Sequence, residues 1–199
     1  VAPDLVYLPE VNFDYDQFYE DIEKAFEKHP NVVVAVSEGV RTADGIYVGE
    51  GTQSGAVDAF GHKYLSGTGK ALELAIKDKF GCKVRSIELN LPQRCASHLS
   101  SKTDLDESVA IGRSAVWYAA SGETGKMMIF TRMEGEKYEV GIDSADISGI
   151  ANAVRSVPRN YINERGNGVT KECLSYIAPL IIGEPTLTFE GGLPKHFVF

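Results

Sequence analysis

The sequence predicts an α/β protein, a three-layer sandwich built around a mostly parallel sheet. Apolar strand-like segments alternate along the chain with segments of helical periodicity. Residues 32–36 are also too uniformly apolar for a strand with one wet face, a pattern typical of a parallel strand that is covered on both sides. Together, these two observations favour strand–helix–strand units.

The first such unit spans residues 5–36. Residues 5–8 are apolar and predict a short buried strand. Residues 14–29 place apolar side chains three and four positions apart, with acidic residues early and Lys28 late, as the helix dipole favours. Pro30 ends this helix, and residues 32–36 form the second strand.

A long loop and a second helix–strand pair follow. Residues 39–69 are rich in glycine and lack periodicity, which predicts a long loop with a functional role. Helical spacing returns over residues 69–80 and stops at Gly81, and residues 83–89 alternate as a strand.

The last part of the chain predicts helices around a hairpin. Thr103 and Asp106 fit a capping box that opens a helix ending near Ala120. Two strands, at residues 126–131 and 138–142, predict a hairpin at a sheet edge, and residues 171–177 predict a short helix.

Composition narrows the classes of partner. The net charge is −8, and no run rich in lysine and arginine is present, so we expect no nucleic-acid partner. An anionic substrate must then be held by a few well-placed arginines. No apolar run approaches the length of a membrane span, and no secretory signal opens the chain.

The cysteines indicate a reducing compartment. Cys82, Cys95 and Cys173 are isolated from one another, which argues against disulfides or a zinc site and favours the cytoplasm. The chain starts with Val1, close to the first predicted strand, so we expect a fragment or a processed product of a longer protein.

Two strand ends are candidate binding positions, because ligands of α/β sheets bind beyond the carboxyl ends of strands. Glu38 follows the strand at residues 32–36, where its carboxylate can accept hydrogen bonds from sugar hydroxyls or act as a capping or salt-bridging group. Arg85 and Arg94 lie on either side of the carboxyl end of the predicted strand at residues 83–89. An arginine fork matches phosphate, although by position alone a solvated surface arginine or a subunit salt bridge is the more common role of such a residue. Arg41 and Arg113 suggest only surface arginines.

Other segments do not match the sequence patterns of known phosphate-binding, metal-binding or nucleophile sites. Residues 67–70, GTGK, lack the spacing of a Walker loop, so they predict a glycine-rich entry to a helix. His62 and His98 have no partners at metal-ligand spacing, and the serines near His98 form no nucleophile elbow. We therefore predict no metal ligand in this chain and no serine nucleophile near His98.

The residues resemble the phosphofructokinase family over nearly the whole chain. The resemblance rests on residues 9–10 (PE), 36–39 (VSEG), 58–62 (DAFGH), Arg85 and above all 90–96 (NLPQRCA). It implies that Glu38 binds the hydroxyls of fructose 6-phosphate. It also implies that Arg94 grips the sugar phosphate, with Arg85 reaching the same phosphate across a subunit interface.

One family contact is altered. Short ATP-using enzymes carry a histidine three positions before the arginine, where this sequence has Leu91, so only a backbone or apolar contact is expected there. Residues 58–62 and the run that follows Arg94 look more like the longer, pyrophosphate-dependent branch. The resemblance therefore implies a pyrophosphate-dependent 6-phosphofructokinase that makes fructose 1,6-bisphosphate in glycolysis.

The resemblance places residues 1–199 in the fructose 6-phosphate-binding, C-terminal portion of such an enzyme. The family's donor-phosphate loop, magnesium-binding aspartate and catalytic base have no counterpart here, so we expect the chain alone to be inactive. Mg²⁺ and the N-terminal half are the implied cofactor and partner, in a homodimer or homotetramer. The alternatives are an ATP-dependent enzyme, a regulatory subunit without catalysis, and an unrelated α/β ligand-binding domain.

Overall fold

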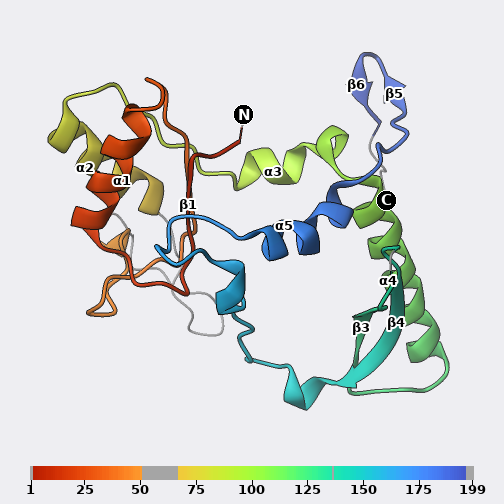
Figure 1. Ribbon diagram of the computed structural model, residues 1–199. Helices are drawn as coiled ribbons and strands as arrows, with labels where there is room; N and C mark the ends of the chain where they lie inside the picture. Colours follow the sequence, from red (N-terminus) through yellow and green to blue (C-terminus); the bar gives the residue numbers. More distant parts are fainter. Residues whose placement is uncertain (1, 51–66, 136, 196–199) are drawn as a thin grey trace. The chain divides into compact units, whose positions relative to one another are not determined.

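The computed structural model describes residues 2–50, 67–135 and 137–195, which form two compact units (Figure 1). The first unit comprises residues 1–89 and 156–174, and the second comprises residues 90–155 and 175–199. Residues 58–62, which contribute to the resemblance above, and His62 lie outside the described residues.

The first unit opens with the predicted strand–helix–strand unit. Strands β1 (Leu5–Tyr7) and β2 (Val34–Val36) pair in parallel, and helix α1 (Tyr15–Phe26) connects them. Asp14 caps the helix, because its side chain accepts a hydrogen bond from the Gln17 backbone N–H. The parallel pair confirms the prediction and places Glu38 just beyond the carboxyl end of β2.

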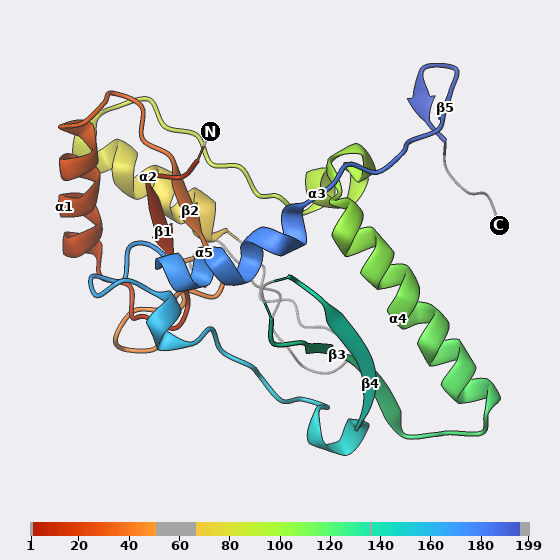
Figure 2. The ribbon, with the colours of Figure 1, turned by 45° about the vertical axis from the view of Figure 1, so that its right-hand side comes forward.

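Helix α2 (Thr68–Phe80) packs beside α1, as Figures 1 and 2 both show. Gly67 precedes it and Gly81 ends it, both with positive φ, so the helical prediction and the glycine-rich entry are confirmed. The ring of Phe80 meets the rings of Tyr19 and Phe26 edge-on, with centroids 6.0 and 5.9 Å away. These contacts join the two helices.

The core of the first unit is aromatic at its centre. Phe18 and Ile22 of α1 are almost fully enclosed, and Tyr7 and Phe13 pack edge-on or tilted against Phe18. Apolar side chains from both helices, β1 and the loop after β2 complete it: Leu5, Val40, Val48, Leu72 and Ile76. The amphipathic pattern of the sequence is therefore satisfied in this unit.

The predicted strand at residues 83–89 is wrong, because residues 82–89 form neither helix nor strand. The alternation is real, since Cys82, Val84 and Ser86 are half-buried and the residues between them are exposed. However, the Ser86 backbone N–H donates to the Glu73 carboxylate at 2.9 Å and makes no ladder bond. A side chain of α2 thus replaces the neighbouring strand that the pattern alone implied.

The returning segment at residues 156–174 closes the first unit. Its start is held by Glu10, whose Oε1 accepts the Val157 backbone N–H at 2.8 Å. A 3₁₀ turn at Arg159–Tyr161 follows, and helix α5 (Lys171–Ile177) begins in this unit and ends in the second, matching the predicted helix.

The second unit contains a long helix beside a hairpin. Helix α3 (Leu91–Cys95) leads through a 3₁₀ turn at Ser97–Leu99 to helix α4 (Lys102–Ala120). The latter runs alongside strands β3 (Lys126–Arg132) and β4 (Val140–Asp146), as seen in Figure 2. These strands pair antiparallel, which confirms the hairpin. Four short elements complete the described part of the unit: 3₁₀ turns at Ile147–Gly149 and Ala178–Ile181, and the paired strands β5 (Phe189–Glu190) and β6 (Leu193–Pro194).

The helix α4 is confirmed, but its predicted capping box is wrong. Ser101 is the N-cap, because its Oγ accepts the Asp104 backbone N–H. Thr103 instead donates its hydroxyl to the Ile182 carbonyl oxygen at 3.0 Å, and Asp106 pairs with Lys102. The cap therefore lies earlier than predicted, because spacing alone does not tell which hydroxyl accepts the N–H of the first turn.

Burial differs sharply between the units. Among the described residues, every buried apolar side chain except Met128 belongs to the first unit. The second unit instead exposes large apolar side chains on its helices and on both faces of its hairpin. No helix within the described ranges is long and apolar enough to cross a membrane.

Candidate functional site

Glu38 lies where the sequence predicted it. Its side chain is exposed two residues after the end of β2, and its backbone is fixed by the buried Thr68, whose Oγ1 donates to the Glu38 carbonyl oxygen at 3.1 Å. Gly39 follows, and a Cβ atom added there would meet the Pro9 ring at 3.4 Å. The backbone of Glu38 is therefore held on both sides, while its carboxylate faces solvent.

Arg85 is exposed in the extended segment 82–89. The next residue, Ser86, is anchored by the Glu73 carboxylate, which accepts both its hydroxyl and its backbone N–H. Further on, Glu88 Oε1 accepts the Gly67 backbone N–H at 3.1 Å. Two side-chain contacts therefore hold the segment carrying Arg85 against α2.

The first turns of α2 thus touch both candidate positions in the first unit. Thr68 fixes the Glu38 backbone, and Gly67 and Glu73 fix the segment of Arg85. Gly69 makes this close fit possible, since a Cβ atom there would lie 3.3 Å from the Ser86 Cβ. The GTGK motif, which failed as a phosphate loop, serves here as a positioning element.

Glu73 is the most strongly perturbed carboxyl group of this region. Hydrogen bonds from the Lys70 ammonium and from the Ser86 hydroxyl and backbone N–H lower the pKa of Glu73 to about 2. The group is therefore ionised at any physiological pH, and it is a structural anion rather than a proton donor.

Leu91 and Arg94 lie on α3 in the second unit. The Asn90 side chain caps this five-residue helix by accepting the Leu91 backbone N–H at 2.6 Å, and Pro92 follows within its first turn. Both Leu91 and Arg94 are exposed. Within the described ranges, neither Arg94 nor Arg85 forms an ion pair, so both guanidinium groups are available to an anionic ligand.

The four residues divide into two pairs. Glu38 and Arg85 share the first unit and a common support in α2, whereas Leu91 and Arg94 share a helix of the second unit. A single cradle built from all four residues stays a prediction.

The other singled-out residues have local roles or none. The Arg41 guanidinium lies over the Tyr47 ring, 3.9 Å from its centroid, and donates to the hydroxyl of the same residue. Cys82, Cys95 and Cys173 are free thiols. No group of three or more histidine, cysteine or acidic side chains in the described part of the chain could hold a metal ion.

Sequence reasoning missed the supporting residues Thr68, Glu73 and Ser86. Thr68 carried a usable signal, because a threonine between two glycines at the start of a helix is placed for backbone contact. Glu73 and Ser86 carried none, since their contact joins positions 13 residues apart with no periodic relation.

Comparison with known proteins adds the decisive observation. No family model matches the chain. It is, however, 39% identical over 193 residues to a protein of Halomonas elongata named pyrophosphate–fructose 6-phosphate 1-phosphotransferase. The alignment covers 97% of this chain and 45% of the relative.

The chain belongs to the phosphofructokinase family. It spans less than half the length of the curated phosphofructokinases that it matches, which is consistent with a C-terminal half and with a place in a larger enzyme.

Solved structures confirm the phosphofructokinase-like α/β fold. The pyrophosphate-dependent phosphofructokinase of Nitrosospira multiformis aligns with a TM-score of 0.80 at 31% identity, covering 98% of this chain and 45% of that one. The corresponding enzyme of Marinobacter aquaeolei gives a TM-score of 0.79 at 28% identity, covering 98% and 44%.

Proposed function

We propose that this chain is the acceptor-sugar portion of a cytoplasmic pyrophosphate-dependent 6-phosphofructokinase. The whole enzyme would transfer phosphate from pyrophosphate to O1 of fructose 6-phosphate and so supply fructose 1,6-bisphosphate to glycolysis. The observation that carries the proposal is the match, along 97% of the chain, to a relative whose name states that reaction.

The site residues would bind different parts of the sugar phosphate. The exposed Glu38 carboxylate, on a backbone held by Thr68, would accept hydrogen bonds from sugar hydroxyls. Arg94 would bind the 6-phosphate bidentately, a geometry that lysine cannot provide. Arg85 would bind the same phosphate from a neighbouring subunit of a homodimer or homotetramer, and Leu91 would contribute a backbone or apolar contact.

The remaining chemistry would be carried out by the part of the enzyme that corresponds to the unaligned residues of its relatives. Phosphoryl transfer depends on positioning and on neutralising charge around the transferred group. We therefore assign the donor site, the catalytic base and the Mg²⁺ ligands to the N-terminal half of the same enzyme. The residues of this chain bind and orient the acceptor.

The test is complementation. We would co-express this chain with the part of the Halomonas elongata relative to which it does not align, and measure fructose 1,6-bisphosphate formation with pyrophosphate and Mg²⁺. Activity with pyrophosphate but not with ATP is expected. Activity with ATP alone would overturn the donor assignment.

The site is tested by a matched pair of variants in that complex. Arg94→Ala is expected to raise the KM for fructose 6-phosphate about thirtyfold, because a charge-assisted contact contributes about 2 kcal/mol. Arg155→Ala removes another exposed arginine of the same unit and should leave the KM unchanged. Equal KM values for the two variants would contradict the assigned role of Arg94.

A further inference from the structure

Arg85 lies on a segment whose register no sheet determines. Residues 82–89 form neither helix nor strand, so no ladder of backbone hydrogen bonds decides which side chains face outward. The side chains nevertheless alternate, because Val84 and Ser86 are half-buried and Arg85 between them is exposed. Successive side chains of an extended chain point in opposite directions, so a slip of one residue would turn Arg85 toward α2. The contact that holds this register therefore orients the guanidinium group.

The apolar contacts of the segment end before Arg85. Cys82 and Val84 pack against the core of the first unit. Beyond Arg85, Ile87 and Leu89 are 77% and 65% exposed, so neither attaches the chain to that core. The contacts that follow Arg85 are therefore polar ones.

Glu73 of α2 makes the nearest of these polar contacts. Its Oε2 accepts both the hydroxyl and the backbone N–H of Ser86, the latter at 2.9 Å. Its Oε1 accepts a hydrogen bond from the Lys70 ammonium at 2.6 Å. Only 18% of the Glu73 side chain is exposed, so water competes little for these donors. The carboxylate thus holds Ser86 through charge-assisted hydrogen bonds.

A second contact lies farther along the segment. Glu88 Oε1 accepts a single backbone N–H, that of Gly67, at 3.1 Å. Glu88 is itself an exposed residue and lies three positions beyond Arg85, whereas Ser86 is adjacent to it. Arg85 forms no ion pair with any described residue, so its backbone is what orients it. Glu73 is therefore the contact that acts most directly on Arg85.

We propose that Glu73 is a positioning residue for sugar-phosphate binding, because it holds Ser86 inward and so turns Arg85 outward toward the phosphate. This inference rests on the proposed function, which assigns Arg85 to fructose 6-phosphate. A guanidinium group on a backbone that is already fixed loses less freedom on binding, so it binds phosphate more tightly. Glu73 thereby raises the affinity for the acceptor without touching it.

The test is a double-mutant cycle on the dissociation constant for fructose 6-phosphate. Isothermal titration calorimetry measures this constant in the complex of this chain with the unaligned part of the Halomonas elongata relative. Glu73→Ala should raise it about tenfold and Arg85→Ala about thirtyfold. The double variant should bind like Arg85→Ala alone, since the group that Glu73 positions is then absent. A combined loss of about three-hundredfold, the product of the two single effects, would overturn the inference.

Two further variants separate positioning from loss of folding. Ser86→Ala keeps the backbone N–H but removes the hydroxyl, so it should raise the dissociation constant about threefold and serves if Glu73→Ala does not fold. Asp78→Ala removes an exposed carboxylate from the same helix and should leave the constant unchanged. Unchanged affinity in both Glu73→Ala and Ser86→Ala would contradict the assigned role.

The readout is independent of phosphate transfer. A complex that binds fructose 6-phosphate and shows the expected cycle, but forms no product with pyrophosphate, supports the role of Glu73 while the proposed function fails. In an active complex, Glu73→Ala should raise the KM and leave kcat nearly unchanged. An unaltered complex that does not bind fructose 6-phosphate would overturn the inference.

Discussion

Asp21 and Arg165 are 144 positions apart, and the Arg165 Nε donates to the Asp21 Oδ1 at 2.5 Å. The other carboxylate oxygen of Asp21 accepts the Tyr7 hydroxyl at 2.8 Å. Asp21 is only 3% exposed, so both partners compensate a buried charge. One carboxylate therefore ties α1 to β1 and to the returning segment.

Asp21→Ala should destabilise the first unit by roughly 1 to 3 kcal/mol, because it leaves the buried Tyr7 hydroxyl without a partner. The measurement is urea denaturation followed by circular dichroism. Adding Tyr7→Phe to this variant removes the unpaired group and should recover part of the loss. A double variant less stable than the sum of the two single changes would contradict the pairing.

Gly166→Ala tests the close approach of the returning segment to Val11. The residue has a φ of +78°, and an added Cβ would lie 2.8 Å from the Val11 Cγ1. Backbone strain of about 1 kcal/mol and overpacking of about 1 to 3 kcal/mol should add. The melting temperature in thermal unfolding reports the combined loss of stability.

Gly45→Ala is the matched control, since Gly45 has a φ of +77° and open space around it. It carries the backbone strain without the clash. The difference in melting temperature between the two glycine variants isolates the steric contribution. Adding Val11→Ala to the Gly166→Ala variant should reduce this difference. Equal melting temperatures for the two glycine variants would refute the contact.

Thr68→Val keeps the shape of a buried side chain but removes the hydroxyl that holds the Glu38 carbonyl. We expect a loss of about 1 kcal/mol in the free energy of unfolding. In the complemented enzyme, the KM for fructose 6-phosphate should rise while kcat changes little, since Glu38 would bind the sugar without taking part in the transfer. Thr68→Ser restores the hydroxyl and should restore the KM, which a merely structural defect would not predict.

The stability of the first unit should depend on Glu73 at acidic pH. Its folded pKa of about 2 lies below the ordinary value of 4.5, so the folded state favours the ionised form. The stabilisation is complete above pH 4.5 and is lost as the pH falls toward 2. Melting temperatures at about pH 7 and about pH 3 should therefore differ less in Glu73→Gln than in the unaltered chain. Glu23→Gln, on the exposed side of α1, should retain the full difference.

The sequence predicted the helices best. Asp14, Gly67 and Gly81 mark their helix ends by local chemistry, so α1 and α2 were found within a few residues. The segment around Arg85 was misassigned because alternation reports which side chains face inward, but not whether a neighbouring strand supplies hydrogen bonds. Glu38 was located because a strand end follows from the pattern. The supports of Glu38 and Arg85 depend on contacts between distant positions, which no local pattern encodes.

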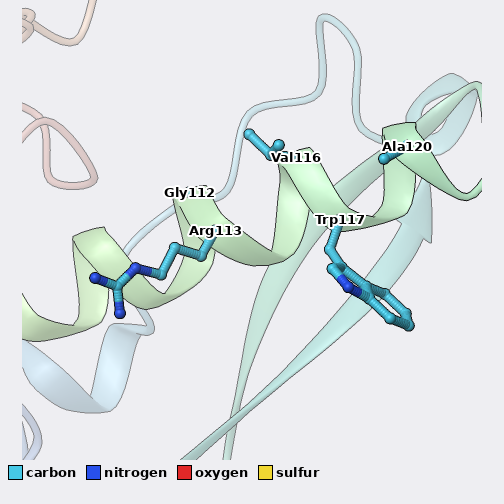
Figure 3. Close-up of a pocket in the computed structure, with 5 residues that line it drawn as sticks. All are labelled: Gly112, Arg113, Val116, Trp117 and Ala120. Carbon is cyan, nitrogen blue, oxygen red and sulfur yellow. The ribbon is translucent and has the colours of Figure 1, made fainter.

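Trp117, the lone tryptophan of the chain, is exposed on α4 in the second unit (Figure 3). Tyrosines lie in both units, since Tyr7, Tyr15 and Tyr19 line the aromatic core of the first, whereas Tyr118, Tyr138 and Tyr176 belong to the second. Indole fluorescence of the unlabelled protein can therefore follow the second unit separately from the first.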